Sequence, residues 1–221
     1  MNGGPHSIEL MVLGTTKFAE NGIVLHSLSQ EYGRRGYLVR IGKKSPQGLL
    51  SPLSLVEAEI VPNPKSELWT ARHLQEAQPL PGIRGNMGKN AMTLFLSEVL
   101  LRSLRDGVNE PGLYAWARSS VLTLDSLQGA YPNYPLRWLL EFAGAMGFRP
   151  SLGDIAPFAG EHLAALRTLV GADFSATLLL PLNGTERNAL CEILLHYLEY
   201  HLEYPLNIRS LPVLRELFAQ S

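Results

Sequence analysis

Hydrophobic and polar positions alternate along the first third of the chain, in short segments that are separated by turn residues. The segments are rich in valine, isoleucine, leucine and aromatic residues, which favour β-strands, and the breaks between them hold glycine, proline and asparagine. Five strands within about seventy residues are typical of a small closed barrel. The strands are predicted at residues 8–13, 22–29, 35–41, 53–61 and 67–75.

The alternation in the third segment predicts which of its side chains enter the core. Tyr37, Val39 and Ile41 fall on one face of the strand. Leu38 and Arg40 fall on the other face, which meets solvent or a ligand. Tyr37 is therefore predicted to be a core residue rather than a platform on which a nucleic-acid base stacks.

The fourth segment carries acidic residues on its outer face. Val56, Ala58 and Ile60 alternate with Glu57 and Glu59. Two exposed carboxylates repel a phosphate backbone, and both ionise normally, so neither becomes a general acid. We therefore expect nucleic acid, if it binds, to use another face of the barrel.

A stretch rich in proline and glycine, residues 78–88, ends the strand pattern, and beyond it the hydrophobic period changes to about 3.6. Asn183 and Glu186 have the spacing of a capping box that begins a long helix. Helices are predicted at residues 89–106, 111–127, 135–146, 162–170 and 185–201, with a last one from residue 210. The pattern predicts an α+β protein of several parts: a barrel domain at residues 1–80, a linker at 81–88 and an α-helical domain at 89–221.

The composition is that of a packed globular protein, with 46% hydrophobic and 18% charged residues among 221. No run of about 18 to 20 uncharged apolar residues is present, which excludes a membrane-spanning helix. Cys191 is the single cysteine, so the chain forms no internal disulfide and no zinc site built from several thiolates. The first residues lack the pattern of a secretory signal, and we expect a cytoplasmic protein.

Charge is distributed unevenly although the net charge is −1. Residues 1–90 carry ten lysines and arginines against seven glutamates, a net charge of +3, whereas residues 91–221 have a net charge of −4. Five cations fall within eleven residues with no acid among them. Such a cluster attracts a polyanion, unless it is only a solvated face of the barrel. Its members are Arg34, Arg35, Arg40, Lys43 and Lys44.

The sequence shows no catalytic constellation. Residues 82–90 lack the glycine at position 83 and the hydroxyl at position 90 of a P-loop, so nucleotide hydrolysis is not expected. His196 and His201 are five residues apart on one predicted helix, which turns them away from a shared metal ion. Cys191 lies among leucines and isoleucines and is predicted to pack as a small hydrophobic residue. We expect neither an enzyme nor a cofactor or metal.

Several short motifs, in the right order, resemble the RecO family of recombination mediators. Each motif is mostly hydrophobic, and the order of the motifs together with the layout of barrel and helices gives the resemblance its weight. The motifs are QEYGRRGYLVR at 30–40, LSPLSLV at 50–56, Lys89 followed by TLFLSEVLL at 93–101, LHYLEYH at 195–201 and SLPVLRE at 210–216.

The resemblance implies an oligonucleotide-binding (OB) fold joined to a helical domain. It further implies a protein that binds single- and double-stranded DNA and anneals complementary strands without being a hydrolytic enzyme. Its expected partners are RecR, the single-strand-binding protein and, indirectly, RecA, and its expected location is the cytoplasm, near the nucleoid. Some members of the family hold zinc with four cysteines, which Cys191 alone cannot do here.

The residues expected to bind DNA are the five cations of the cluster, because OB folds bind nucleic acid along a strand face and its loops. Phosphate contacts carry no base information, so binding is predicted to tolerate any sequence. Lys17, Arg72 and Arg84 are further candidates. In the acidic helical part, Arg209 and, less so, Arg137 are candidates for holding the acidic tail of the single-strand-binding protein, although a salt bridge at the edge of the core explains both better.

Three alternatives stay open at this point. The chain is a DNA-binding or annealing module without loading activity, or it is an adaptor whose barrel binds protein and whose cations are merely solvated. The third, an unrecognised hydrolase, needs a carboxylate or metal cluster that the sequence does not show.

Overall fold

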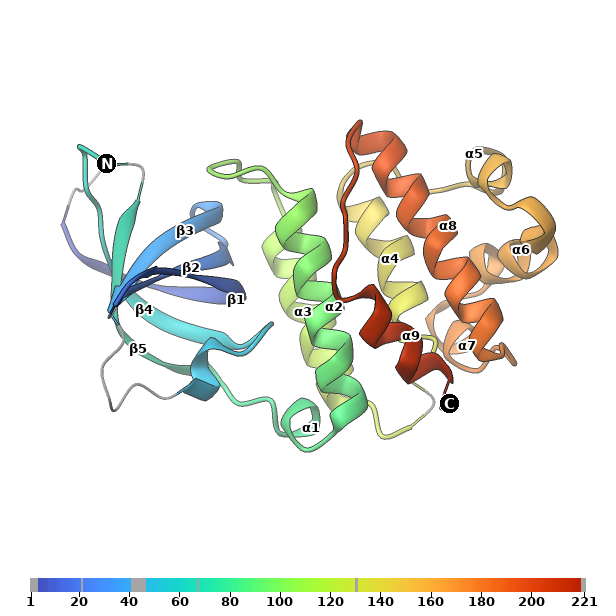
Figure 1. The fold of residues 1–221 in the computed structure, drawn as a ribbon, viewed down its shortest axis with the longest axis horizontal. Coiled ribbons are helices and arrows are strands. Elements are labelled where there is room, and N and C mark those ends of the chain that lie inside the picture. The colour runs from blue at the N-terminus through green and yellow to red at the C-terminus, as the bar shows by residue number, and fades with distance from the viewer. Residues whose placement is uncertain (1–3, 21, 41–46, 67, 130, 220–221) are drawn as a thin grey trace. The chain divides into compact units, whose positions relative to one another are not determined.

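The computed structural model (Figure 1) describes the whole chain except residues 1–3, 21, 41–46, 67, 130 and 220–221. The chain folds into two compact units. The first comprises Met1–Pro81 with Ser97–Arg118, and the second comprises Gly82–Leu96 with Ser119–Ser221.

The first unit is built on a closed barrel with the strand order β1-β2-β3-β5-β4. Neighbouring strands pair in antiparallel fashion except β3 and β5, which run parallel and pair only at Tyr37 with Trp69 and at Leu38 with Thr70. The bounds are β1 (His6–Ala19), β2 (Gly22–Ser29), β3 (Gly33–Arg40), a 3-10 turn η1 (Gln47–Leu50), β4 (Leu55–Val61) and β5 (Trp69–Gln78). This confirms the predicted five-stranded barrel followed by helices.

The core of the barrel consists of the inward side chains of all five strands. Tyr37 is fully buried there, as predicted, whereas Ile41 lies outside the described residues. On β4 the predicted alternation is confirmed, because Glu57 and Glu59 lie on the outer surface and bind Ser7 and Arg72. The other core residues are Ile8, Leu10, Val12, Leu25, Val39, Val56, Ala58, Ile60 and Ala71.

Part of the helical sequence packs with the barrel. Gly33 has a φ of +62°, and a Cβ atom there would lie 2.1 Å from the carbonyl oxygen of Val108, so the two backbones meet closely. The backbone N–H of Gly107 donates to the carbonyl oxygen of Arg34 over 2.8 Å, and Asn109 donates to the carbonyl oxygen of the β2–β3 turn. The loop between α2 (Met87–Ser103) and α3 (Leu113–Ser126) thereby belongs to the first unit.

The segment expected to be a linker, residues 81–88, contains helical structure. A short helix α1 occupies Pro81–Arg84, and α2 begins at Met87. Asp125 accepts a hydrogen bond from the backbone N–H of Ile83 over 2.7 Å, which anchors α1 within the second unit. Proline and glycine here begin a helix instead of keeping the chain extended.

The second unit is a helical bundle around α4 and α8. Helix α4 packs on α7 and α8, and α8 packs on α6 and α9. Asn183 and Glu186 form the predicted capping box at the start of α8, each side chain bonding to the other residue's backbone N–H. The bounds are α4 (Tyr134–Ala145), α5 (Leu152–Ile155), η2 (Ala156–Phe158), η3 (Gly160–His162), α6 (Leu163–Gly171), α7 (Phe174–Leu178), α8 (Gly184–Leu202) and α9 (Leu211–Ala219).

Two buried cations hold helix ends in this unit. The ammonium group of Lys89, 3% exposed, donates to the carbonyl oxygens of Asp125 and Leu127 at the end of α3. The guanidinium of Arg187, 8% exposed, donates to the side chain of Asn133 over 2.9 Å. Each satisfies backbone or side-chain acceptors that burial would otherwise leave unpaired.

Candidate nucleic-acid interface

The outer face of β2 and β3 carries two of the cations predicted to bind DNA, Arg34 and Arg40. Residues that pair across neighbouring antiparallel strands point to the same side of the sheet. On β3 the outward positions alternate with the buried Tyr37 and Val39, and their β2 partners share the same side. This outer face consists of Arg34, Gly36, Leu38 and Arg40 on β3 with Val24 and His26 on β2. We call it the β2–β3 face.

Arg34 lies at one end of this face beside an acid. Its guanidinium is 3.8 Å from the carboxylate of Asp106, and the two side chains are 18% and 57% exposed. Asp106 belongs to the loop that donates the Gly107 N–H to Arg34. At 3.8 Å, and with Asp106 largely exposed, this ion pair is a weak one of at most about 1 kcal/mol.

Arg35 follows on the opposite side of the strand and stacks on an aromatic ring. Its guanidinium carbon lies 3.7 Å from the centre of the Trp69 ring, and Tyr32 meets the same ring edge-on at 5.1 Å. Stacking uses the flat face of a guanidinium, whose N–H groups point outward in its plane. Sequence reasoning missed this group of Tyr32, Trp69 and Arg35, because contacts between β3 and β5 leave no local pattern.

Arg40 and Lys17 lie at the other end of the barrel, and both are exposed. Lys17 pairs with Ile23 and Arg40 with Gly22, which places the two cations on strands either side of β2. Arg40 lies six positions after Arg34 along the strand, which corresponds to a distance of about 20 Å. The described cations therefore occupy both ends of β3 and do not form one cluster. Lys43 and Lys44 lie outside the described residues.

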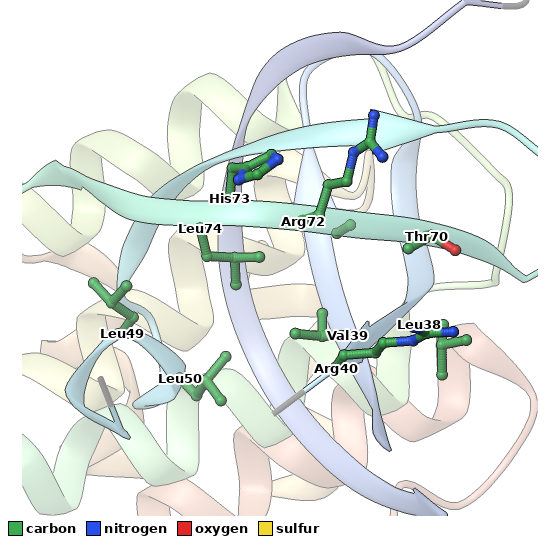
Figure 2. A pocket seen from close by; sticks show the side chains of 10 residues that line it. Leu38, Val39, Arg40, Leu49, Leu50, Thr70, Arg72, His73 and Leu74 are labelled. Carbon is green, nitrogen blue, oxygen red and sulfur yellow. The ribbon is translucent and has the colours of Figure 1, made fainter. Parts of the chain in front are cut away.

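A cleft of about 400 Å³ opens beside Arg40 (Figure 2). Among the described residues β3 and β5 pair at two positions, and Leu38 and Thr70 of the second pair line this cleft. Figure 2 shows the side chains of β5 on one side of the cleft and those of β3 and η1 on the other. The lining combines aliphatic side chains with polar groups: Leu38, Val39, Arg40, Leu49, Leu50, Thr70, Ala71, Arg72, His73 and Leu74.

Arg72 is held by an acid, whereas Arg40 has no ion pair among the described residues. Both Nε and a terminal nitrogen of Arg72 donate to one carboxylate oxygen of Glu59, over 3.1 and 2.6 Å. His73 lies 3.9 Å from the other oxygen of the same carboxylate. The charge of Arg72 is therefore largely offset. Arg84 lies on α1 in the second unit and is not part of the barrel surface.

A second hollow of about 390 Å³ lies on the β2–β3 face and was not anticipated from the sequence. Its lining residues come from β2, β3, the residue before β5 and the α2–α3 loop. They are Val24, His26, Arg35, Gly36, Leu68, Asp106 and Gly107. We call it the His26 groove.

The two arginines considered for partner binding lie on separate elements of the second unit. Arg137 on α4 donates to Glu141 over 2.7 Å and to the carbonyl oxygen of Ala172 over 2.9 Å. It borders a small hollow of about 70 Å³ together with Arg149. Arg209 is exposed in the segment before α9. The salt bridge at Arg137 matches one of the two interpretations made from the sequence.

The described residues hold no group of three or more histidine, cysteine, aspartate or glutamate side chains placed to bind a metal ion. His201 stacks on Phe148 with ring centres 4.9 Å apart, whereas His196 is exposed. Cys191 is fully buried, and burial raises the pKa of its thiol, which keeps it protonated and unreactive. Among the described helices, none has the length and apolar character that crossing a membrane requires.

Comparison with known proteins gives matches along nearly the whole chain. Residues 84–156 match the family model described as "Recombination protein O C terminal". The chain is 25% identical over 235 residues to the DNA repair protein RecO of Phocaeicola vulgatus, covering 95% of this chain and 97% of that one. It is 25% identical to the protein of the same name from Bacteroides fragilis, with 94% and 97% covered. The RecO protein of Flavobacterium psychrophilum is 27% identical, with 95% and 97% covered.

Proposed function

We propose that this chain, which is similar to DNA repair proteins RecO along nearly its whole length, is a member of the RecO family and a mediator of DNA repair and homologous recombination. It binds single- and double-stranded DNA without sequence specificity and anneals complementary strands. With RecR, it helps to load RecA onto DNA that is covered by the single-strand-binding protein. The observation that carries the proposal is the similarity to DNA repair proteins RecO over both the barrel and the helices.

The proposed DNA site is the β2–β3 face with the cations at its two ends. In OB folds this face and the adjoining loops bind oligonucleotides. Arg34 at one end and Arg40 with Lys17 at the other contact phosphates, and the small and apolar residues between them lie under the bases. Lys43 and Lys44, which were predicted to bind DNA, lie outside the described residues, and their part in this site stays a prediction.

The proposed partner side is the second unit. The residues of this unit include eight lysines and arginines against ten acids, a net charge of −2, which disfavours DNA and favours protein partners. We assign RecR and the acidic tail of the single-strand-binding protein to this part, with Arg137 and Arg209 as the candidate contacts for the tail. Function by binding alone needs no catalytic group, cofactor or metal.

The test is a binding titration followed by an annealing assay on the full chain. Fluorescence anisotropy with a labelled single strand and with a duplex measures affinity at two salt concentrations. Annealing of complementary strands is then followed with and without RecR, and RecA loading with the single-strand-binding protein present. Binding without annealing or loading would leave only a DNA-binding module, and the absence of all binding would contradict the proposal.

The second candidate function is a protein-interaction adaptor whose barrel binds protein. Two observations favour it: Arg34 is paired with Asp106, and Arg35 is stacked on Trp69, so both already have partners within the chain. If the protein is an adaptor, the anisotropy of a labelled oligonucleotide should not change at low salt. If the protein is a mediator, the anisotropy should rise to saturation, and the affinity should fall as the salt concentration rises.

A further inference from the structure

The His26 groove has the dimensions of a ligand site. Its volume of about 390 Å³ falls in the range of about 300–1,000 Å³ that is usual for small-molecule pockets. Val24 and Leu68 make parts of its lining apolar, whereas His26 and Asp106 make others polar. A few polar groups among apolar walls is the usual composition of a small-molecule site.

Gly36 keeps the floor of the groove open. A Cβ atom at this position would lie 3.2 Å from a methyl group of Val24, 3.7 Å from Leu68 and 3.9 Å from Nδ1 of His26. A side chain here would therefore fill the space between these three residues. Glycine inside a strand weakens the strand because it has no side chain to pack, and it often marks a place where a ligand approaches the backbone closely. At Gly36 the missing side chain leaves this space open.

His26 presents a nitrogen that lacks a partner. Its Nε2 lies 3.0 Å from the hydroxyl oxygen of Thr16. Its Nδ1 is buried and has no hydrogen-bond partner among the described residues. Buried polar atoms in proteins are nearly always paired. Nδ1 faces the space beside Gly36, 3.9 Å from where a Cβ atom would lie, so a ligand that enters the groove and displaces the atoms covering Nδ1 would complete its bonding.

The charges around His26 keep its ring neutral near pH 7. Burial and the nearby positive charge of Arg34 lower the pKa of His26, and Asp106 acts in the opposite direction with a smaller effect. A neutral imidazole offers a donor at one nitrogen and an acceptor at the other. Nδ1 is therefore suited to the edge of an uncharged ring that carries amide-like groups, which is the chemistry of a nucleobase.

We propose that the His26 groove receives one unpaired base of a bound single strand, with the base edge hydrogen-bonded to Nδ1 of His26. This rests on the proposed DNA binding and deepens it. Arg34 lies at the rim and Arg40 farther along β3, so the strand's phosphates have cations on both sides of the groove. A base within a duplex stays paired and stacked, and it does not enter. The groove therefore favours single strands over duplexes.

The test compares three probes on the full chain: a labelled oligo-dT, a strand of the same length in which the bases are replaced by abasic residues, and a duplex. The wild-type protein is expected to bind the abasic strand about fivefold more weakly than oligo-dT, the effect of about one hydrogen bond. His26→Ala is expected to lose the same factor on oligo-dT and nothing on the other two probes. Gly36→Ala, which fills the floor, should behave likewise. His196→Ala, an exposed histidine on α8, is the matched control and should change nothing.

Equal wild-type affinity for oligo-dT and the abasic strand overturns the proposal, and this comparison needs no variant to fold. A His26→Ala variant that loses affinity equally for all three probes also overturns it, because that loss reflects structure rather than a base contact. Failure of the wild-type protein to bind any of the probes contradicts DNA binding itself, which keeps the two conclusions separate.

Discussion

The carboxylate of Glu9 on β1 accepts a hydrogen bond from the hydroxyl group of Tyr114 on α3, over 2.5 Å. The same oxygen accepts from Nε of Arg118 over 2.7 Å, one helical turn later. Glu9 thus joins the barrel to a helix that is more than a hundred residues away in the sequence. The start of α3 belongs to the first unit for this reason.

The first prediction concerns the stability that this contact supplies. Burial disfavours the charged form of Glu9, but hydrogen bonds from Arg118 and Tyr114 and the charge of Arg118 outweigh it, so the pKa of Glu9 lies below its usual 4.5. Glu9→Gln is expected to lower the free energy of unfolding by about 1–2 kcal/mol at neutral pH. Urea unfolding followed by circular dichroism measures this loss.

The same contact sets a pH dependence. Because the pKa of Glu9 is lower in the folded than in the unfolded chain, its contribution is complete above about pH 4.5 and is lost as the pH falls through the folded pKa. The difference in stability between wild type and Glu9→Gln should therefore shrink under acid. A difference that stays constant from about pH 3 to pH 7 contradicts this account.

The second prediction concerns Lys89. Burial lowers the pKa of its ammonium group, yet two carbonyl oxygens at the end of α3 accept its hydrogen bonds. Lys89→Met keeps the shape and leaves both acceptors unpaired, with an expected loss of about 2–3 kcal/mol. Lys65→Met, at an exposed position, is the control and should be nearly neutral. Thermal unfolding measures the melting temperatures of the two variants. Equal melting temperatures would contradict the stabilising role of the Lys89 hydrogen bonds.

The third prediction concerns Arg40. Arg40→Glu should weaken binding of a single strand roughly fivefold at low salt and make the slope of log K against log salt shallower by about 0.7 per lost phosphate contact. The control is Arg167→Glu, which makes the same charge change at an exposed position of α6 in the second unit. If both variants weaken binding equally, only net charge matters and Arg40 is not a contact.

The fourth prediction is a gain of DNA affinity when Asp106 is neutralised. Asp106 lies 3.8 Å from Arg34 and competes with a phosphate for it. Asp106→Asn is expected to tighten binding of single strands and duplexes about two- to threefold at low salt, with the gain reduced at high salt by screening. Glu110→Gln, an exposed acid in the same loop, is the comparison. Unchanged affinity of Asp106→Asn in anisotropy titrations removes Arg34 from the interface.

Local patterns predicted the elements of this fold well. The alternation of β3 placed Tyr37 in the core, and the spacing of Asn183 and Glu186 located the start of α8. Both follow from interactions within a few residues. The attachment of the α2–α3 loop to the barrel did not follow, because the close approach of Gly33 to Val108 joins distant parts of the chain.

The sequence supplied candidate cations for the site, which stay a prediction, but it did not supply their arrangement. Arg34 and Arg40 are close in the sequence, but an extended strand separates them by about 20 Å, so the cations lie at two ends. The partners of Arg34 and Arg35, Asp106 and Trp69, come from other segments. His26 and Gly36 carried no signal in the sequence, since their role depends on the space between strands and loop.

The account depends most directly on whether the full chain binds a single strand through the β2–β3 face. Anisotropy of a labelled oligo-dT, titrated with wild type and with the double variant Lys17→Glu, Arg40→Glu at two salt concentrations, measures this. We predict saturable binding by wild type that weakens with salt, and a double variant with much lower affinity and a shallower salt slope. Anisotropy that stays flat at low salt, or equal binding by both proteins, would contradict it.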